Sequence, residues 1–213
     1  MKQRDAFLQS EGDAWLARNS PQGTAPALPD SDELLLAILQ LPAAPAAVAT
    51  KLLEIGCASG SRLAWLRQNR GFECHGLDPS AKAVEAAKAQ GVIAKQGTAE
   101  SLPYDAASFD IVVFGFCLYL CDREDLFRIA YEADRVLRNP GWIVIRDFYN
   151  PAPSQRAYHH RPGIFSFKMD YRTLFSWHPG YSNSFHKLGH HVDGSHTDDP
   201  NEWVATSVMR KCW

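Results

Sequence analysis

The chain has 213 residues, a formal net charge of -2 at pH 7 and a hydrophobic content of 46%. A chain of this length buries one sizeable core but is short for two full domains, so we expect a single domain over residues 1–213. The balanced charge provides no basic field that would attract phosphates, so nucleic acid is not an expected partner. A small molecule is the expected partner instead.

The five cysteines are odd in number, form no C-x-x-C pair and lie mostly within apolar runs. This pattern favours reduced thiols over a disulfide framework or a zinc site, and we expect no metal. The first residues contain no apolar core of a signal peptide, and no stretch reaches the roughly 18 apolar residues of a membrane span. The expected protein is cytoplasmic, does not bind a membrane, and is a monomer or a homodimer.

Two helices are predicted near the N-terminus. Residues 3–18 and 31–41 combine apolar and charged positions as helices do, and the second follows Asp30 and Ser31. The segment between them, residues 20–29, is rich in proline and predicts a linker.

The middle of the chain alternates strand-like and helix-like segments. Short apolar runs predict strands at residues 51–56, 72–78, 92–96, 109–116 and 141–148. Amphipathic or alanine-rich segments predict helices at residues 61–69, 80–90 and 122–137, the last with Asp122 as its N-cap. This order predicts an α/β fold of the Rossmann-like kind, with a doubly wound and mostly parallel sheet.

The character of the chain changes after the fifth predicted strand. An aromatic and histidine-rich stretch follows, and its prolines exclude long helices. Residues 184–192 and 203–211 predict two strands that pair as an antiparallel edge of the sheet. The predicted organisation is N-terminal helices (1–49), a core (50–148), an insert (149–184) and C-terminal strands (185–213).

The segment LLEIGCASG closely resembles the motif with which class I methyltransferases bind S-adenosylmethionine (SAM). Its sharp turn between strand and helix brings backbone against the cofactor, which Gly56 and Gly60 permit. The resemblance implies that Glu54 holds the methionine end of SAM and that Cys57 lies beside the cofactor. Ala58 departs from the common motif, which has a glycine there. A glycine turn of another α/β fold is the alternative interpretation.

The segment GLDPS ends the second predicted strand at Asp78, which Pro79 follows. A carboxylate at this place accepts hydrogen bonds from the ribose diol of a nucleoside cofactor. Asp78 would suit the ribose of NAD as well, but a dinucleotide fold requires G-x-G-x-x-G, and Ala58 breaks that spacing. Asp78 as a simple N-cap of the next helix is the structural alternative.

The segment GTAESLPYDAASFDIVVF resembles the part of the same family that contacts adenine and leads into the fourth strand. The resemblance implies that Thr98 and Ala99 contact adenine and that Glu100 and Phe114 lie beside the cofactor. Thr98 is a second departure, because an acidic residue is usual at its position. Together the motifs cover residues 50–148 and are most similar to the small-molecule methyltransferases that include enzymes of ubiquinone and menaquinone synthesis.

The predicted helix at residues 3–18 is similar to segments that fold over the bound cofactor in small methyltransferases. This resemblance implies a helical lid in which Trp15 and Arg18 contact SAM. An amphipathic helix packed on the sheet edge is the alternative.

The acceptor is expected at the carboxyl ends of the strands, where open α/β sheets bind ligands. The candidates that follow the fourth and fifth strands or lie in the insert are Phe116, Tyr119, Asp147, Tyr149, Asn150, Tyr158 and Arg161. The aromatic residues of the insert could instead form ordinary core.

Four histidines in adjacent pairs are further candidates. His159 and His160 are the candidate general bases, because imidazole titrates near neutral pH. Adjacent loop histidines with a surface or structural role are the alternative. His190 and His191 are interpreted as a polar turn, because adjacent histidines lack the helical spacing of metal ligands.

The predicted function is the transfer of a methyl group from SAM to an O or N atom of a small molecule by in-line displacement. A sugar or a secondary-metabolite intermediate is the expected acceptor. The alternatives are a methyltransferase-like protein that binds SAM without catalysis and an NAD-linked oxidoreductase, which the glycine spacing opposes.

Overall fold

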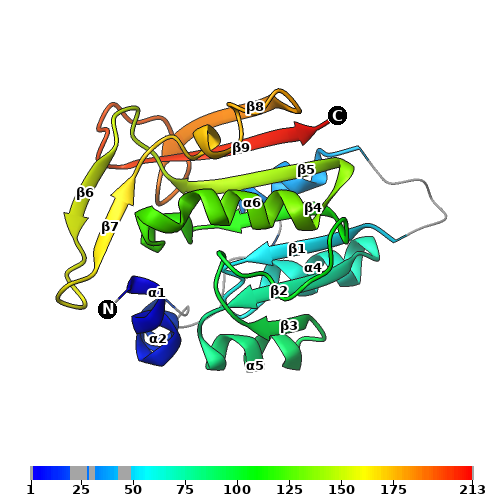
Figure 1. The fold of residues 1–213 in the computed structure, drawn as a ribbon, viewed down its shortest axis with the longest axis horizontal. Helices are drawn as coiled ribbons and strands as arrows, with labels where there is room; N and C mark the ends of the chain where they lie inside the picture. Colours follow the sequence, from blue (N-terminus) through cyan, green and yellow to red (C-terminus); the bar gives the residue numbers. More distant parts are fainter. Residues whose placement is uncertain (1, 20–27, 29–31, 43–48, 213) are drawn as a thin grey trace.

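The structure is a computed structural model, and it describes residues 2–19, 28, 32–42 and 49–212 (Figure 1). The linker predicted at residues 20–29 lies almost wholly outside the described residues, as do Asp30 and Ser31. No helix in the described part of the chain is long and apolar enough to cross a membrane.

The fold is a seven-stranded sheet in the order β3-β2-β1-β4-β5-β9-β8. Its strands are β1 (Lys51–Ile55), β2 (Glu73–Asp78), β3 (Ile93–Gln96), β4 (Phe109–Gly115), β5 (Leu137–Phe148), β8 (Tyr181–His190) and β9 (Trp203–Lys211). Strands β1 to β5 pair in parallel, whereas β9 pairs antiparallel with β5 and with β8. The predicted mostly parallel Rossmann-like sheet with an antiparallel C-terminal edge is therefore confirmed.

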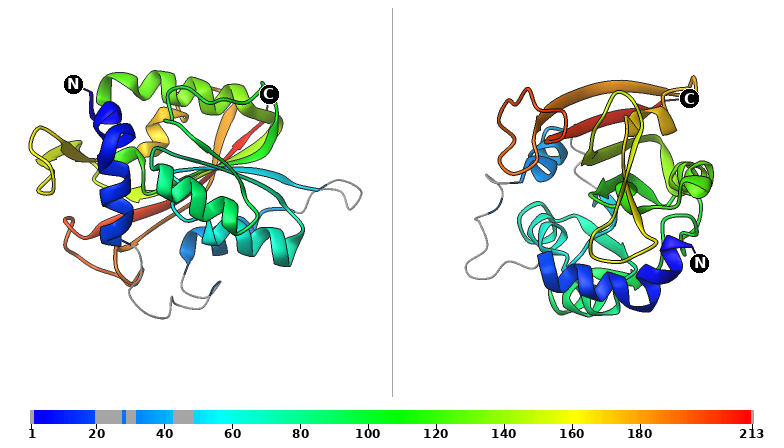
Figure 2. Two further views of the ribbon diagram at one scale, coloured as in Figure 1. Left: turned by 90° about the horizontal axis from the view of Figure 1, so that it is seen from below. Right: turned by 90° about the vertical axis from the view of Figure 1, so that its left-hand side faces the viewer.

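Helices cover both faces of this sheet, as the views in Figures 1 and 2 show. The helices on the two faces are α3 (Glu33–Leu39), α4 (Ser61–Arg70), α5 (Ala81–Ala89) and α6 (Leu126–Val136). Helices α1 (Gln3–Ala6) and α2 (Gly12–Asn19) lie at the carboxyl ends of the strands (Figure 1). Short turns are η1 (Phe7–Glu11), η2 (Leu118–Leu120), η3 (Arg123–Asp125) and η4 (Tyr171–Leu174). One apolar cluster joins the sheet to α3, α4 and α5, and a second joins it to α6 and η4.

The central strands are apolar almost without interruption because helices bury them from both sides. In β1, Leu52 packs into the cluster beneath α3 to α5, while Leu53 and Ile55 pack into the cluster beneath α6. All three side chains are at most 3% exposed. The parallel pairing of β1 with β2 and with β4 places the carboxyl ends of these three strands at one end of the sheet.

The N-terminal helix predicted at residues 3–18 is present but contains one π-helical turn, η1, between α1 and α2. The helix predicted from Asp122 begins later, at α6, after the 3-10 turn η3. Asp122 makes no side-chain capping bond to its own helix. Its carboxylate instead accepts the backbone N–H groups of Gln3 (2.9 Å) and Arg4 (3.0 Å), so it caps the N-terminal helix.

The region predicted as an insert contains no long helix, as expected. Strands β6 (Ser154–Ala157) and β7 (Phe165–Lys168) form a separate antiparallel pair, which stands beside the N-terminal helix in Figure 1. Strand β8 begins within this region, earlier than the predicted start at residue 184. The pairing of β8 with β9 confirms the predicted antiparallel edge.

Candidate functional site

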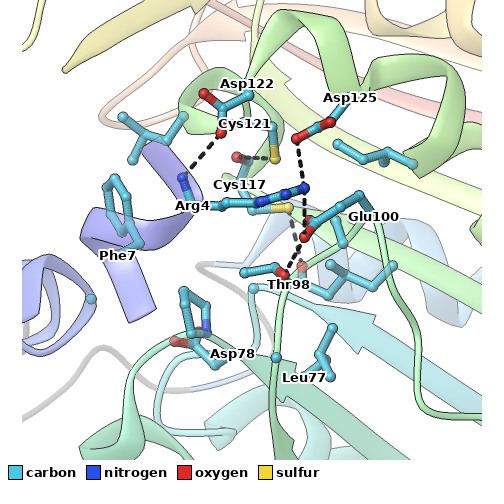
Figure 3. A pocket seen from close by; sticks show the side chains of 18 of the residues that line it. Arg4, Phe7, Leu77, Asp78, Thr98, Glu100, Cys117, Cys121, Asp122 and Asp125 are labelled. Atoms are coloured by element: carbon cyan, nitrogen blue, oxygen red, sulfur yellow. Dashed lines mark hydrogen bonds and ion pairs between the residues drawn. The ribbon is translucent and has the colours of Figure 1, made fainter. Parts of the chain in front are cut away.

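A cavity opens at the carboxyl ends of β1, β2 and β4, and the N-terminal helix covers it (Figure 3). Its empty space is about 770 Å³, a figure that includes the part open to solvent. The predicted residues that line it are Trp15, Gly56, Asp78, Pro79, Thr98, Ala99, Glu100 and Phe116. The structure therefore brings together side chains from all three motifs and from the N-terminal helix.

The glycine turn after β1 needs its glycines for different reasons. Gly56 has a φ of 78°, and a Cβ there would lie 2.7 Å from the Cβ of Cys117. Gly60 has a φ of 75°, and a Cβ there would meet the Cβ of Ala87 in α5 at 2.8 Å. Gly56 thus keeps the cavity wall close to the end of β4, while Gly60 permits α4 to pack against α5.

Ala58, the departure from the common motif, also has a positive φ of 47°. Its N–H donates to Asp78 Oδ2 at 2.9 Å, which holds the turn against the end of β2. A residue with a Cβ is strained in this region of backbone space, and glycine is not. The conformation of the usual glycine is therefore retained with alanine in its place.

Replacing Ala58 with glycine is expected to raise the free energy of unfolding by about 1 kcal/mol, because the left-handed strain is removed. Ala107→Gly is the matched control, since Ala107 has a φ of 50° in a turn that does not line the cavity. Both variants should unfold at higher denaturant concentration, and only Ala58→Gly should change the affinity for SAM. Equal stability of Ala58→Gly and the unchanged protein would contradict the assignment of strain.

Asp78 projects into the cavity from the end of β2 (Figure 3). Its Oδ1 accepts the N–H of Ser80 at 2.9 Å and its Oδ2 accepts that of Ala58, while burial raises the pKa of the carboxyl. Each carboxylate oxygen accepts more than one hydrogen bond, so capacity remains for a ribose diol. The alternative that Asp78 caps the next helix is wrong, because Ser80 is the N-cap and its hydroxyl accepts the N–H of Ala83.

Thr98, Ala99 and Glu100, which lie in the loop after β3, also line the cavity. The hydroxyl of Thr98 donates to Glu100 Oε1 at 2.6 Å. The carboxylate of this loop therefore comes from the residue two positions after the usual acidic site.

Glu54 does not line the cavity. Its carboxylate is 1% exposed and forms an ion pair with Arg62 of α4, whose Nε also donates to Asp32 Oδ2 at 2.8 Å. Glu54 Oε2 is buried without a hydrogen-bond partner in the described part of the chain. Burial raises the pKa of Glu54 to about 7 although Arg62 opposes this. Its contact with the methionine end of SAM stays a prediction.

Four other predicted cofactor residues also lie outside the cavity. Gly60 packs against α5, Cys57 and Phe114 are buried, and Arg18 bonds to Glu11 and to the hydroxyl of Tyr158. The sequence motifs did not separate residues that shape the turn and core from residues that face the cavity. The reason is that both kinds lie on the same short segments.

Phe116, one of the predicted acceptor residues, directly follows β4 and lines the cavity. Phe116 has a φ of 50°, and its ring lies 5.6 Å from that of Phe148. Strained non-glycine residues are concentrated at functional sites. Tyr119 packs behind this wall, and its hydroxyl accepts the indole N–H of Trp15 at 3.0 Å. Tyr119 thus positions a cavity residue and does not itself line the cavity.

Asp147 is buried at the end of β5. Its carboxylate accepts backbone N–H groups of Leu118 (2.8 Å), Tyr119 (3.4 Å) and Phe148 (2.8 Å). Burial nevertheless raises the pKa of Asp147 to about 7. These contacts show that Asp147 holds the turn η2 behind the cavity, so its predicted contact with the acceptor gains no support.

The remaining acceptor candidates lie away from the cavity lining. Tyr149 packs against Trp203, the Asn150 side chain accepts the N–H of Ala152, and Arg161 bonds to Ser10 in the N-terminal helix. Tyr158 is buried and receives a hydrogen bond of 2.8 Å from Arg18. These last two residues join the insert to the N-terminal helix.

His159 and His160 are exposed, and their ring centroids lie 3.8 Å apart. Neither lines the cavity. Their role as general bases therefore stays a prediction without support from the geometry, and the surface alternative describes their placement better.

His190 ends β8 and His191 follows it. Both side chains approach Glu202, which the sequence analysis did not single out. His191 Nδ1 lies 2.5 Å from Glu202 Oε2, and the donor atoms of all three residues lie within 4.8 Å of one another. His190 Nδ1 accepts the N–H of Val192 at 3.1 Å, so a neutral ring carries its proton on the nitrogen that faces Glu202.

Several cavity residues were missed by the sequence analysis. Those with polar or aromatic side chains or thiols are Arg4, Phe7, Cys117, Cys121, Asp122 and Asp125. Arg4 and Phe7 belong to the N-terminal helix. The sequence predicted that this helix covers the cofactor, but it did not indicate these two residues. The cysteines follow β4, so the rule that ligands bind at strand ends could have found them.

The cavity fits a nucleoside cofactor without phosphates. Asp78 can accept a ribose diol, and the glycine turn leaves the backbone open. Among the described residues that line the cavity, Arg4 is the only cation, and it is paired with Glu100 and Asp125. A dinucleotide would need donors for its pyrophosphate, so the geometry opposes NAD.

Comparison with known proteins agrees with this geometry. Residues 53–145 match the family described as "Methyltransferase domain". The chain is 34% identical over 110 residues to the methyltransferase YcgJ of Bacillus subtilis, which covers 47% of this chain and 42% of that protein. A methyltransferase from Synechocystis is 33% identical over 104 residues, 48% of this chain and 49% of that protein. The match thus spans about half the length of these relatives or less.

Solved structures share the fold over nearly the whole chain. A methyltransferase of Haloferax volcanii, solved with the Trm112 activator, has a TM-score of 0.68 at 20% identity and covers 97% of this chain and 98% of that one. The 1,6-didemethyltoxoflavin-N1-methyltransferase of Burkholderia thailandensis, solved with S-adenosylhomocysteine, has a TM-score of 0.67 at 15% identity and covers 99% and 87%. Residues 53–145 thus match a methyltransferase domain, and the chain shares the fold of these solved methyltransferases.

Proposed function

We propose that this protein transfers the methyl group of SAM to an O or N atom of a small molecule by in-line displacement. The observation that carries the proposal is one cavity in which Asp78 and the glycine turn adjoin an aromatic wall formed by Phe116 and Trp15. When bound, SAM supplies a methyl group on a positively charged sulfur. The protein's own residues supply alignment and exclusion of water.

The aromatic wall is held rigidly enough to align an acceptor. The indole of Trp15 is fixed by its hydrogen bond to Tyr119, and the Tyr119 ring lies 5.0 Å from that of Phe148. Phe148 in turn contacts Phe116. Rigid positioning of this kind accounts for much of the rate gain in displacement reactions, so the wall favours an acceptor with an apolar or aromatic body.

Nitrogen acceptors are supported better than hydroxyl acceptors. A hydroxyl would need a base to remove its proton. No histidine or lysine is among the described residues that line the cavity, and its carboxylates, Asp78, Glu100, Asp122 and Asp125, are already held by hydrogen bonds or ion pairs. An amine or ring nitrogen with a free lone pair needs none. The N1-methyltransferase of Burkholderia thailandensis, which shares the fold, is consistent with this preference. A sugar or secondary-metabolite intermediate that carries such a nitrogen remains our proposed acceptor.

The proposal also retains a single domain, a cytoplasmic location, and a monomer or homodimer without nucleic acid or membrane partners. A protein that binds SAM without catalysis is the second candidate. The absence of histidine and lysine among the described cavity residues favours this second candidate only for hydroxyl acceptors.

Saturating S-adenosylhomocysteine is expected to raise the melting temperature by roughly 5–10 °C, because a ligand at 100 times its Kd adds about 2.7 kcal/mol to the stability of a native protein. Differential scanning fluorimetry with NAD as the comparison ligand checks this. Stabilisation by NAD and none by SAM or its product would contradict the function. If the protein binds SAM but forms no S-adenosylhomocysteine with any amine or hydroxyl acceptor, the non-catalytic candidate is favoured.

A further inference from the structure

The end of strand β8 brings together three side chains that are good ligands for a transition metal. His190 and His191 stand at this end, and Glu202 directly precedes β9. The pairing of His190 with Trp203 across the two strands places Glu202 beside both histidines. The sequence predicted only a polar turn here, because the histidines are adjacent and Glu202 is distant from them along the chain.

The three side chains converge on one point. One ligand atom from each of His190, His191 and Glu202 lies within 4.8 Å of the other two. Among the residues that the structure describes, no other three histidine, cysteine, aspartate or glutamate side chains meet in this way. His190 and Glu202 are partly buried and His191 is exposed, so an ion can enter from solvent.

The distances within this group suit a single metal ion. Glu202 Oε2 lies 2.5 Å from His191 Nδ1 and 3.6 Å from His190 Nε2. Ligand atoms at about 2.0–2.2 Å from a tetrahedral zinc ion lie roughly 3.4 Å apart. The His190 distance already matches this value, and a rotation of the exposed His191 ring would bring the other distance to it. Two imidazole nitrogens and one carboxylate form a known zinc ligand set, with water in the fourth position.

The ring of His190 has a partner for its second nitrogen. His190 Nδ1 accepts the N–H of Val192, which places the ring proton on Nε2. Metal binding at Nε2 moves this proton to Nδ1, which lies 3.8 Å from Asp193 Oδ1. Histidine ligands usually donate their other ring N–H to a carboxylate, because that contact fixes the ring and makes the metal-binding nitrogen more basic. The hydrogen bond from Val192 is given up, so the affinity should be lower than that of a preformed structural zinc site.

We propose that His190, His191 and Glu202 bind one divalent transition-metal ion of the Zn²⁺ type. The imidazole ligands favour Zn²⁺ over Mg²⁺ and Ca²⁺, which prefer oxygen ligands. Lys168 of β7 does not occupy the carboxylate, because its Nζ donates to the backbone oxygen of Asn201. The bound ion joins the end of β8 to the start of β9 and closes the segment between them.

The proposed metal site adjoins the aromatic wall of the cavity without belonging to it. The His191 ring lies 6.2 Å from that of Phe148, which in turn contacts Phe116. None of the three proposed ligands lines the cavity. The inference therefore does not rest on the proposed function, and the binding of Zn²⁺ can be measured without SAM.

The test is calorimetric titration of the full chain, prepared without a histidine tag, with ZnCl₂ and separately with MgCl₂. One Zn²⁺ ion per chain is expected to bind, and Mg²⁺ is not. His190→Ala, His191→Ala and Glu202→Gln should each weaken Zn²⁺ binding at least about 10-fold, because even the loss of an outer partner of a ligand commonly has an effect of this size. Zn²⁺ should also raise the melting temperature of the unchanged protein more than that of these variants, because it binds the folded state.

His196→Ala and Cys212→Ser are the matched controls. His196 belongs to the same segment between β8 and β9, but it approaches Asp198 and its side chain is 89% exposed. Cys212 is an exposed thiol outside the proposed metal site. Both variants should bind Zn²⁺ as the unchanged protein does. Circular dichroism checks that every variant is folded.

Several outcomes would overturn the inference. Zn²⁺ binding that Glu202→Gln leaves intact would reduce the group to a pair of surface histidines. Binding that is lost in His196→Ala or Cys212→Ser would assign the ion to another part of the surface. Failure of the unchanged protein to bind Zn²⁺, or equal binding of Mg²⁺, would also contradict the proposed metal site. None of these results bears on S-adenosylhomocysteine binding, which tests the proposed function separately.

Discussion

Replacing Arg62 with methionine is expected to lower the free energy of unfolding by about 3 kcal/mol at pH 8. The substitution removes the cation that pairs with Glu54, whose carboxylate is only 1% exposed. Removal of one partner of a buried pair leaves an uncompensated charge, which typically costs about 3–5 kcal/mol, and the partial exposure of Arg62 favours the lower value. Urea denaturation of both proteins measures the difference.

The pH dependence of this loss identifies its cause. The pKa of Glu54 is raised from 4.5 to about 7 in the folded protein, so between these values the folded state binds more protons than the unfolded state. Stability therefore falls as the pH rises from about 4.5 to about 7. Without Arg62 the pKa of Glu54 rises further, so the decline should continue above pH 7 in Arg62→Met. A loss of stability that is the same at pH 5 and pH 8 would contradict an electrostatic origin.

Two further variants serve as controls for Arg62→Met. Arg67→Met changes an exposed arginine of the same helix, and it should alter the stability by no more than about 0.5 kcal/mol. The double variant Arg62→Met with Glu54→Gln should recover much of the loss, because a neutral amide then replaces the buried carboxylate. Asp32 loses the same arginine but still accepts the N–H of Leu35.

Replacing Asp78 with asparagine is expected to weaken binding of S-adenosylhomocysteine by roughly 10- to 100-fold. Charge-assisted hydrogen bonds to the ribose are lost, which corresponds to about 1.5–3 kcal/mol. In the unchanged protein the backbone N–H groups of Ala58 and Ser80 each donate to the Asp78 carboxylate at 2.9 Å. In the variant, the NH2 group of the amide would face one of these two donors, so that hydrogen bond is lost. Isothermal titration calorimetry measures the affinity directly.

Asp13→Asn is the matched control for Asp78→Asn. Asp13 receives the hydroxyl of Ser80 at 2.5 Å, so it contacts the same turn, but it does not line the cavity. Its replacement should leave the affinity nearly unchanged. Equal affinity of a folded Asp78→Asn variant and the unchanged protein would show that the ribose lies elsewhere.

The order of strands and helices could be predicted from the sequence because it depends on local patterns. Apolar runs such as that of β1 are buried by helices on both faces, which is the environment that such runs indicate. The glycines of the first motif were predicted for the same reason, since a positive φ at Gly56 and Gly60 is a property of the local backbone. Asp78 was predicted to face the ligand site because ligands of open α/β sheets bind at the carboxyl ends of the strands.

The partner that a side chain contacts elsewhere in the fold could not be predicted from the neighbouring residues in the sequence. Glu54 belongs to the SAM motif, yet its carboxylate turns to Arg62 on the helix-covered face. Asp122 caps a helix at the other end of the chain, and only the packing of the two ends brings them together. His159 and His160 have the residue type of a base, but the hairpin of the insert leaves them exposed.

The sequence by itself determined the α/β order, the glycine turn and the position of Asp78 at the end of β2, because strand burial and backbone conformation follow from neighbouring residues. Only the tertiary structure decided that Arg4 reaches Glu100 and Asp125 and that Tyr119 holds Trp15. These contacts join segments far apart along the chain. The free energy that selects them comes from packing the N-terminal helix against the sheet edge, and no local pattern records that packing.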